Sequence, residues 1–211
     1  MIVKGRELWA GDVLLTRYPA KYSWKTLRWW LFKIALYKFQ KIRYPKSARP
    51  KSLWETHARI FDTRSEWYSG TYPKAIKESF NPETLDCPWV IVRYKFQEDW
   101  GPKQLAALQK VIDENVGKPY DIPQLAGIAA QILFHGILPE SWRIDGGTEK
   151  RVCSVWVLMF LVHVWKTTLR KYIRPLLGMN VELCAPADFE NWLSVFPDGH
   201  QELTFEVVAE G

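Results

Sequence analysis

Cys153 is the residue whose type and position point most directly to chemistry. It opens the apolar run Arg151-Val-Cys-Ser-Val-Trp-Val-Leu-Met-Phe160, which predicts a helix with the thiol in its first turn. The free N–H groups and the dipole at that end of a helix favour the thiolate, which is the nucleophilic form of cysteine. A neighbouring histidine would accept the thiol proton and later donate it to a leaving group. The pattern therefore indicates nucleophilic thiol catalysis.

Four histidines compete for the role of base. His57 stands at the start of an alternating segment that predicts a strand, far upstream of Cys153. His163 is excluded because it lies ten residues beyond Cys153 on the same predicted helix, about 15 Å along the axis. The other two lie near a predicted helix end and in a loop, and they are less constrained: His135 and His200.

The cysteines and the N-terminus exclude several classes of protein. The three cysteines are scattered and form no CxxC pair, and the chain has no HExxH motif, so we expect neither a metal nor a cofactor. An odd, scattered set also argues against a disulfide scaffold and fits a reducing compartment. The first seven residues carry charges and precede no apolar core, so no secretory signal is expected. We expect a cytoplasmic protein or one peripheral to a membrane, without a transmembrane helix.

The positive charge of the chain is concentrated in one segment. No acidic residue occurs between Asp12 and Glu55, whereas eleven of the 29 Lys and Arg residues lie there. The rest of the chain has 18 Lys and Arg against 23 Asp and Glu. Its net charge is therefore −5, although the net charge of the whole chain is +6. One basic segment, residues 18–54 with Arg17 at its edge, therefore makes the protein basic.

This segment is also aromatic, above all between Trp24 and Tyr44. Interleaved aromatic and basic residues suit an anionic lipid surface, here through residues 21–51, or a stacked nucleic-acid strand, which we do not expect. Arg28, Lys33 and Lys38 recur every five residues and so do not share one face of a helix. The plainer interpretation is a helical insertion packed on the domain with its lysine stems directed outward.

The remaining sequence alternates between strand and helix patterns. The expected strands are residues 11–17, a hairpin of 56–61 with 66–72, then 89–96 and 202–209. The expected helices are residues 102–117, 122–138, 153–172 and 185–193. Strands precede helices and one strand returns, so the fold class is α+β, a mostly antiparallel sheet packed against helices. We expect a single domain, 1–211, with 18–54 as a basic aromatic insertion after the first strand.

Five short motifs occur in an informative order. They are Gly11-Asp12, Thr56-His57-Ala-Arg-Ile, Gly117-Lys-Pro-Tyr120-Asp121, Val152-Cys153-Ser154 and Ala185-Pro186-Ala-Asp188. Together they resemble the circularly permuted branch of the NlpC-like papain superfamily, which includes bacterial YiiX-type proteins and is similar to lecithin–retinol acyltransferase. The resemblance covers most of the chain and implies a permuted papain-like fold, with Cys153 as nucleophile and His57 as base.

The resemblance also implies a third polar residue that orients the imidazole. Across the predicted hairpin Ser69 and Thr71 come near His57, and Glu66 lies closer to the turn. We choose Ser69, although its hydroxyl would stabilise an imidazolium less than the carboxylate or amide that family members often carry.

Other motif residues are expected to hold the structure. Asp12 would hold the first turn, Tyr120 would be a packed phenol, and Asp121 would cap the following helix, a frequent role for Asp at that position. Asp188 resembles another helix cap. The chain departs from the family at Val155-Trp156, where an acidic residue is common, so contacts to substrate near the nucleophile differ.

These residues lead to two hypotheses. The first is a cysteine hydrolase or acyl-transfer enzyme that cleaves a cell-wall peptide amide or a lipid ester through an acyl-enzyme, with the basic segment suited to an anionic envelope surface. The alternative is a catalytically inactive module of the same fold that binds a membrane or a partner, which the missing acidic third residue favours. The sequence does not predict an oligomeric state.

Overall fold

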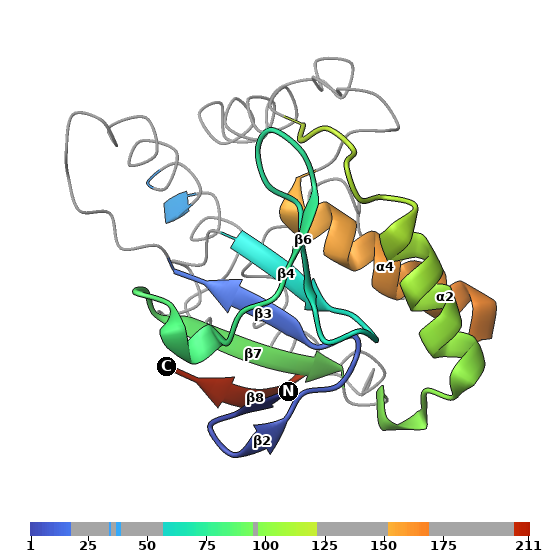
Figure 1. The fold of residues 1–211 in the computed structure, drawn as a ribbon, viewed down its shortest axis with the longest axis horizontal. Helices are drawn as coiled ribbons and strands as arrows, with labels where there is room; N and C mark the ends of the chain where they lie inside the picture. The colour runs from blue at the N-terminus through green and yellow to red at the C-terminus, as the bar shows by residue number, and fades with distance from the viewer. Residues whose placement is uncertain (18–33, 35–36, 39–56, 95–96, 122–151, 169–204) are drawn as a thin grey trace.

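A six-stranded antiparallel sheet organises the described part of the chain. The computed structural model describes residues 1–17, 34, 37–38, 57–94, 97–121, 152–168 and 205–211 (Figure 1). The sheet has the strand order β6-β5-β4-β3-β7-β8, and β1 and β2 form a separate hairpin. The strands are β1 (Ile2–Val3), β2 (Arg6–Glu7), β3 (Val13–Thr16), β4 (His57–Phe61), β5 (Trp67–Ser69), β6 (Ile76–Glu78), β7 (Trp89–Tyr94) and β8 (Phe205–Glu210).

The middle of the sheet is built from continuous apolar runs. Strands β3 and β7 pair with each other, and every residue of both is buried. Such runs are typical of strands that are covered on both faces, and β-branched residues such as those of β7 pack well there. The sheet therefore separates two hydrophobic cores.

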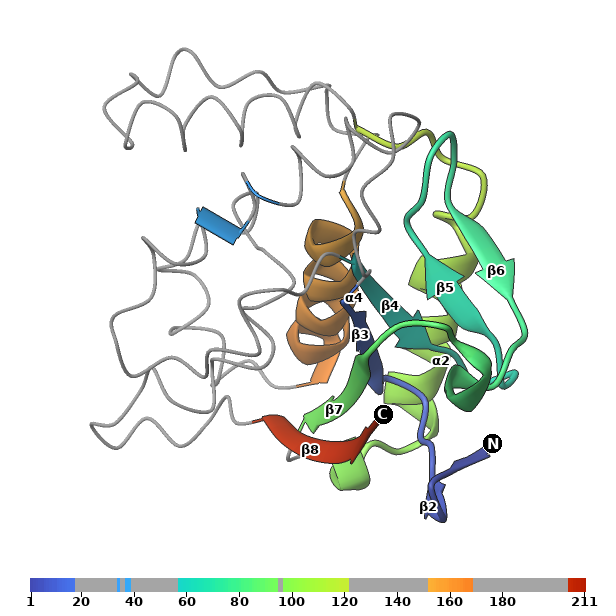
Figure 2. The same cartoon turned by 90° about the vertical axis from the view of Figure 1, so that its left-hand side faces the viewer.

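Helices α2 (Pro102–Asp113) and α4 (Cys153–Thr168) cover one face of the sheet and pack against each other (Figures 1 and 2). Leu108 and Ile112 of α2 are fully buried with the apolar side of α4 and with Ala58 and Ile60 of β4. The first turn of α2 is tied by Gly101 N–H, which donates to Gln104 Oε1 at 3.1 Å. This face is the larger core and fixes the start of α4 against β4.

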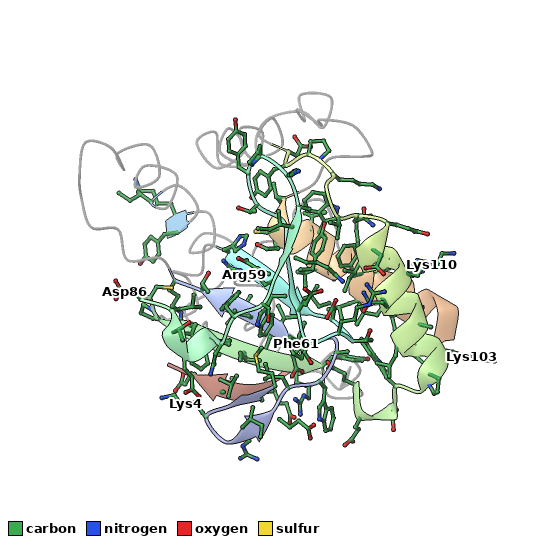
Figure 3. All side chains as sticks on the ribbon, in the orientation of Figure 1. Lys4, Arg59, Phe61, Asp86, Lys103 and Lys110 are labelled. Atoms are coloured by element: carbon green, nitrogen blue, oxygen red, sulfur yellow. The ribbon has the colours of Figure 1, made fainter. Side chains whose placement is uncertain are left out.

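The opposite face carries a second core. It contains Leu14, Phe61, Trp67 and Ile91 from the sheet, with Val3 from the β1–β2 hairpin beside them. Figure 3 labels Arg59 and Phe61 on β4. Since side chains alternate along a strand, His57 and Arg59 share the face of Phe61, and Ala58 and Ile60 face the helices.

The Gly11-Asp12 motif is structural. Asp12 Oδ2 accepts the N–H of Trp9 at 2.8 Å, and the two carboxylate oxygens accept from Arg93 Nε at 2.8 Å and Nη2 at 2.7 Å. Burial raises the pKa of Asp12 and outweighs the opposing effect of the hydrogen bond from Arg93. Gly11 has a φ of +104° and lies against the ring of Trp100, so a side chain there would be strained and crowded. Asp12 holds the first turn, as expected.

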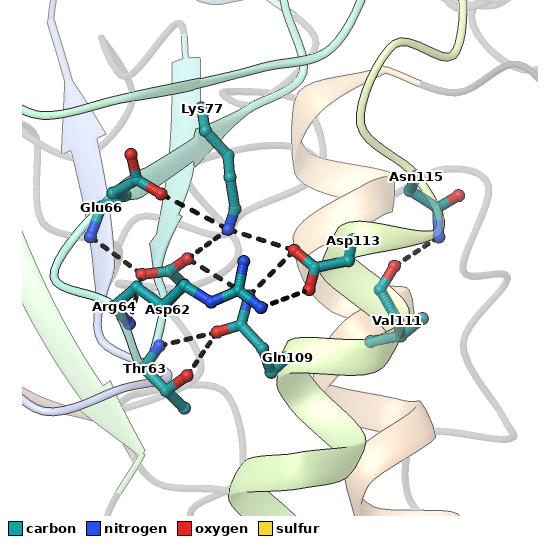
Figure 4. Close-up of polar contacts among 9 residues, drawn as sticks. All are labelled: Asp62, Thr63, Arg64, Glu66, Lys77, Gln109, Val111, Asp113 and Asn115. Atoms are coloured by element: carbon teal, nitrogen blue, oxygen red, sulfur yellow. Dashed lines mark hydrogen bonds and ion pairs between the residues drawn. The ribbon is translucent and has the colours of Figure 1, made fainter.

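A charged cluster joins the β4–β5 turn to α2 and β6 (Figure 4). Asp62 is buried, and its Oδ2 lies 2.6 Å from Lys77 Nζ, which also lies 3.1 Å from Asp113 Oδ1 and 3.5 Å from Glu66 Oε2. Asp62 Oδ1 accepts the N–H groups of Arg64 and Glu66, both at 2.8 Å. We call Asp62, Glu66, Lys77 and Asp113 the Asp62 cluster. It locks the hairpin to α2.

The predicted α+β class with a mostly antiparallel sheet is confirmed for the described residues. The predicted hairpin is β4 paired with β5, and the predicted strand 89–96 is β7. The predicted strand 202–209 corresponds to β8, Phe205–Glu210, and its first three residues lie outside the described residues. Helix α2 ends at Asp113, before the predicted 117, because the chain turns there and reaches Gly117 with a φ of +84°.

Several predicted features lie outside the described residues. These are the helices 122–138 and 185–193, the end of the helix 153–172 beyond Thr168, Asp188, and the insertion 18–54 apart from Ile34, Tyr37 and Lys38. No helix among the described residues has the length and apolar character needed to cross a membrane.

Candidate functional site

Cys153 is the first residue of α4, as the sequence predicts. Its side chain is buried, with 4% of the residue exposed. The first turn of the helix closes around it, because Trp156 N–H donates to Val152 O at 3.1 Å. Burial raises the pKa of the Cys153 thiol, and the N–H of Ala58, the hydroxyl of Tyr120 and the N–H of Ser154 oppose that rise without cancelling it. The resting thiol is therefore protonated, with donors already in position for a thiolate.

The sulfur of Cys153 lies within hydrogen-bonding reach of the backbone N–H of Ala58, which shows where the thiol sits in the fold. Ala58 follows His57 in β4, and its side chain belongs to the core beneath α4. The start of α4 thus meets the start of β4. Gly70, just past β5, also lies here: a Cβ at that position would lie 3.1 Å from the Cα of Cys153 and would also clash with the ring of Trp156. Only glycine fits between the β5 end and the first turn of α4.

The His57 imidazole is held by Ser69. Its Nε2 lies 2.9 Å from Ser69 Oγ, and Ser69 is buried. The sheet creates this contact because β5 pairs with β4 with Ser69 opposite Arg59, which makes Ser69 a diagonal neighbour of His57. Of the three sequence candidates for the orienting residue, Ser69 makes this contact. Thr71 lies beyond the end of β5, and Glu66 belongs to the Asp62 cluster at the other end of the hairpin.

His57 is a neutral group in this site. Burial lowers its pKa well below the ordinary value, and the positive charge of Arg59 lowers it further. A neutral imidazole can accept a proton, which a general base must do. Within the described residues the imidazole is hydrogen bonded to Ser69 and not to the thiol of Cys153. The thiol therefore meets β4 at the residue after His57, and the imidazole and the thiol each have a polar partner of their own.

Tyr120 is a site residue that the sequence interpretation treated as a packed phenol. Its hydroxyl donates to Cys153 Sγ at 4.0 Å. Burial, and then the nearby Cys153, raise the pKa of Tyr120 well above its ordinary value, so the phenol stays a donor. The backbone holds it there because Tyr120 N–H donates to Pro73 O at 3.0 Å and Ala75 N–H donates to Lys118 O at 2.8 Å. The motif Gly117-Lys-Pro-Tyr120-Asp121 was the available signal.

Arg59 is the second residue that sequence reasoning missed. It lies two positions after His57 on the same face of β4 and is buried. Its positive charge lowers the pKa of His57, after burial, and no sequence pattern predicted that Arg59 is buried. Val155 and Trp156, where the family resemblance suggests an acidic residue, are buried in the core under the sheet.

The remaining candidates do not reach the site or lie outside the described residues. His163 is exposed on α4, ten residues beyond Cys153, whereas His135 and His200 are not among the described residues. In the described ranges no three His, Cys, Asp or Glu side chains are grouped as a metal ion would require. The polar groups that do converge are a thiol, an imidazole, a phenol and a hydroxyl.

Comparisons with known proteins add no family to this geometry. No protein-family model matches the chain, and no curated protein matches it at a significant level.

Proposed function

We propose that this chain is a cysteine-dependent hydrolase or acyl-transfer enzyme with a permuted papain-like fold of the NlpC-like type. The observation that carries the proposal is the position of Cys153 at the start of α4, against the strand whose first residue is His57, with Ser69 bonded to that imidazole. A thiol, an imidazole and a group that orients the imidazole are the parts that thiol acyl transfer requires.

In the proposed reaction, His57 accepts the proton of the Cys153 thiol while the sulfur bonds to the carbonyl carbon of an amide or ester. The tetrahedral intermediate then expels the amine or alcohol, which takes the proton from the imidazolium. Water, or a second alcohol or amine in a transfer, attacks the thioester and the thiol is restored. Ser69 orients the imidazole through Nε2, so Nδ1 is the nitrogen that serves the thiol.

Two further contacts support this chemistry. The Tyr120 hydroxyl and the Ala58 amide both lower the pKa of the Cys153 thiol, so they stabilise the thiolate as it forms. Because His57 and Cys153 are not hydrogen bonded at rest, the imidazole closes on the sulfur when substrate binds, as catalytic contacts often tighten only in the complex.

Alkylation with iodoacetamide at pH 7 tests the nucleophile and its base. In a Cys87→Ser, Cys184→Ser background we expect Cys153 to be alkylated and His57→Ala to slow the reaction about tenfold. His163→Ala is the matched control, since it removes an exposed histidine from the helix that carries the thiol. The enzyme proposal fails if Cys153 reacts no faster than Cys87 and Cys184 in the native chain and His57→Ala has no effect.

The alternative is a catalytically inactive module that keeps this fold and binds a membrane or a partner. Its support is that His57 is backed by the hydroxyl of Ser69 rather than by a carboxylate, which stabilises an imidazolium less. The same alkylation experiment separates the two, because an inactive module needs no coupling between His57 and Cys153.

The proposed substrate is a cell-wall peptide amide or a lipid ester, and the basic segment 18–54 suits work at an anionic surface. Two residues that flank it in the sequence, Thr16 and His57, are cross-strand partners in the sheet. We expect the protein to co-sediment with vesicles containing anionic phospholipid and not with neutral ones, because eleven basic residues lie between Asp12 and Glu55. Equal binding to both kinds of vesicle, or binding to neither, would contradict a role at an anionic surface.

Product analysis on peptidoglycan fragments and phospholipids then identifies the bond cleaved.

A further inference from the structure

Arg59 lies among the residues of the candidate site. It shares a face of β4 with His57, it is the cross-strand partner of Ser69, and Thr16 is the cross-strand partner of His57. Cross-strand partners in an antiparallel sheet project to the same side, so these four side chains form one group spread over β3, β4 and β5.

The guanidinium of Arg59 is fixed from several sides. Its side chain is 8% exposed, its Nε lies 3.0 Å from Glu78 Oε1, and its Nη1 donates to Thr16 Oγ1 at 3.4 Å. It also lies 5.5 Å from the ring centre of Phe80. Glu78, on β6, is 33% exposed, so the positive charge is the more deeply buried member of the pair.

We infer that Arg59, held by Glu78 and Thr16 on the same face of the sheet as His57 and Ser69, is a positioning residue of the thiol site that fixes a positive charge beside the imidazole and the thiol. The inference rests on the proposed function, because it assigns Arg59 a role in the chemistry of Cys153 and His57. Arg59 need not touch a substrate, since it acts through the charges of these two groups.

Within the described residues, the charged and titratable groups around His57 and Cys153 come from β4, β6, α4 and the segment after α2. They are Arg59 on β4, Glu78 on β6, Cys153 on α4, and Tyr120 and Asp121 after α2. Burial first, and Arg59 second, lower the pKa of His57. Burial raises the pKa of the Cys153 thiol, and Arg59 is among the groups that lower it. A single positive charge therefore acts on base and nucleophile in the same direction.

Titration of charge variants tests the inference in the Cys87→Ser, Cys184→Ser background. The probes are the ¹³C NMR titration of His57, assigned with His57→Ala, and the pH dependence of iodoacetamide alkylation of Cys153. Arg59→Met should raise both midpoints by about half to one pH unit and slow alkylation at pH 7 by about threefold to tenfold. Glu78→Gln leaves the guanidinium uncompensated, so it should lower both midpoints and speed alkylation.

The controls separate charge from packing. Arg59→Lys keeps the charge and should hold both midpoints within about 0.3 units of the parent. Arg93→Met removes another buried arginine of the sheet, the partner of Asp12, and should lower stability without moving either midpoint. If Arg59→Met does not fold, the other two variants test the inference: both midpoints should fall in Glu78→Gln and should barely change in Arg59→Lys.

The inference is overturned if Arg59→Met or Glu78→Gln leaves both midpoints in place, or if Arg93→Met moves them equally. That result is distinct from failure of the proposed function, which is a lack of effect of His57→Ala on Cys153 alkylation. If His57→Ala slows alkylation but the Arg59 and Glu78 variants shift neither midpoint, the proposed enzyme function stands and the role of Arg59 is rejected.

Discussion

Strand β4 has a polar cluster at each end, and the two clusters are built in opposite ways. Past its last residue, the Asp62 cluster brings together ionised groups: Lys77 Nζ lies within 3.5 Å of three carboxylates. At its first residue, the imidazole of His57 is neutral and bonded to a hydroxyl, and the nearby thiol of Cys153 is protonated and bonded to a phenol.

The pKa directions express the same contrast. Burial alone would lower the pKa of Lys77, but Asp62 and Asp113 raise it on balance, so the ammonium is charged and compensated. At the other end burial dominates, lowering the pKa of His57 and raising that of Cys153. The compensated cluster favours the charged form of Lys77, whereas at the other end burial favours the neutral imidazole and the neutral thiol.

The largest effect should come from breaking the compensated end. Asp62→Asn keeps the shape of the side chain and removes its charge, leaving Lys77 without its nearest carboxylate. Because truncating one partner of a buried pair leaves the other uncompensated, we expect the free energy of unfolding to fall by about 3 kcal/mol in urea denaturation. The rate of Cys153 alkylation in the folded protein should not change.

Glu66→Gln is the matched control for that variant. Glu66 Oε2 lies 3.5 Å from Lys77 Nζ, and its side chain is 37% exposed, so its loss should cost less than about 1 kcal/mol. A stability change in Asp62→Asn as small as in the control, or a changed alkylation rate, would remove the distinction between the two ends of β4.

At the other end, the next largest effect is expected for Tyr120→Phe. The hydroxyl is a donor to Cys153 Sγ and lowers the pKa of that thiol, so its removal leaves less thiolate at neutral pH. Alkylation at pH 7 should slow about fivefold, which corresponds to a hydrogen bond of about 1 kcal/mol. Tyr72→Phe, on an exposed ring near the end of β5, is the control and should have no effect. An unchanged rate in Tyr120→Phe would return Tyr120 to the packing role that the sequence suggested.

The sequence predicted the parts of this comparison that depend on local pattern. The apolar run of β7, the spacing in α2 and the apolar residues after Cys153 each define an element without reference to the rest of the chain. The position of His57 at a strand start followed from alternation. Counting across the hairpin placed Ser69 and Thr71 near it, and Ser69 makes the contact.

The parts that the sequence did not predict depend on contacts between distant segments. Tyr120 reaches the thiol because its backbone is hydrogen bonded to Pro73, 47 positions earlier. Arg59 is buried because Glu78 meets it from β6, a three-residue strand too short for a periodic signal. The Asp62 cluster likewise draws on the β4–β5 turn, β6 and α2, and charges in separate segments give no pattern along the chain.

A smaller effect is expected for Ser69→Ala, which removes the partner of His57 Nε2. The imidazole keeps its place in β4 but is no longer held in one orientation, so alkylation of Cys153 at pH 7 should slow about threefold. Ser79→Ala, an exposed serine just after β6, is the control and should react at the parent rate. If Ser69→Ala is alkylated at the same rate as that control, Ser69 does not orient the imidazole. Thr71→Ala and Glu66→Gln are then the variants to measure.

A separate effect, on stability and not on alkylation, is the pH dependence that the neutral imidazole imposes. The pKa of His57 is lower in the folded protein than in the unfolded chain, where it is about 6.5. Above that pH both states leave the ring unprotonated, and His57 makes no pH-dependent contribution. Below it the unfolded chain binds a proton that the folded site resists, so stability falls as the pH falls, by at most about 1.4 kcal/mol per pH unit. Urea midpoints of the parent and of His57→Gln should therefore separate between pH 7.5 and pH 5, with the parent losing more. If the imidazole of His57 is as readily protonated in the fold as in water, His57→Gln should instead run parallel to the parent.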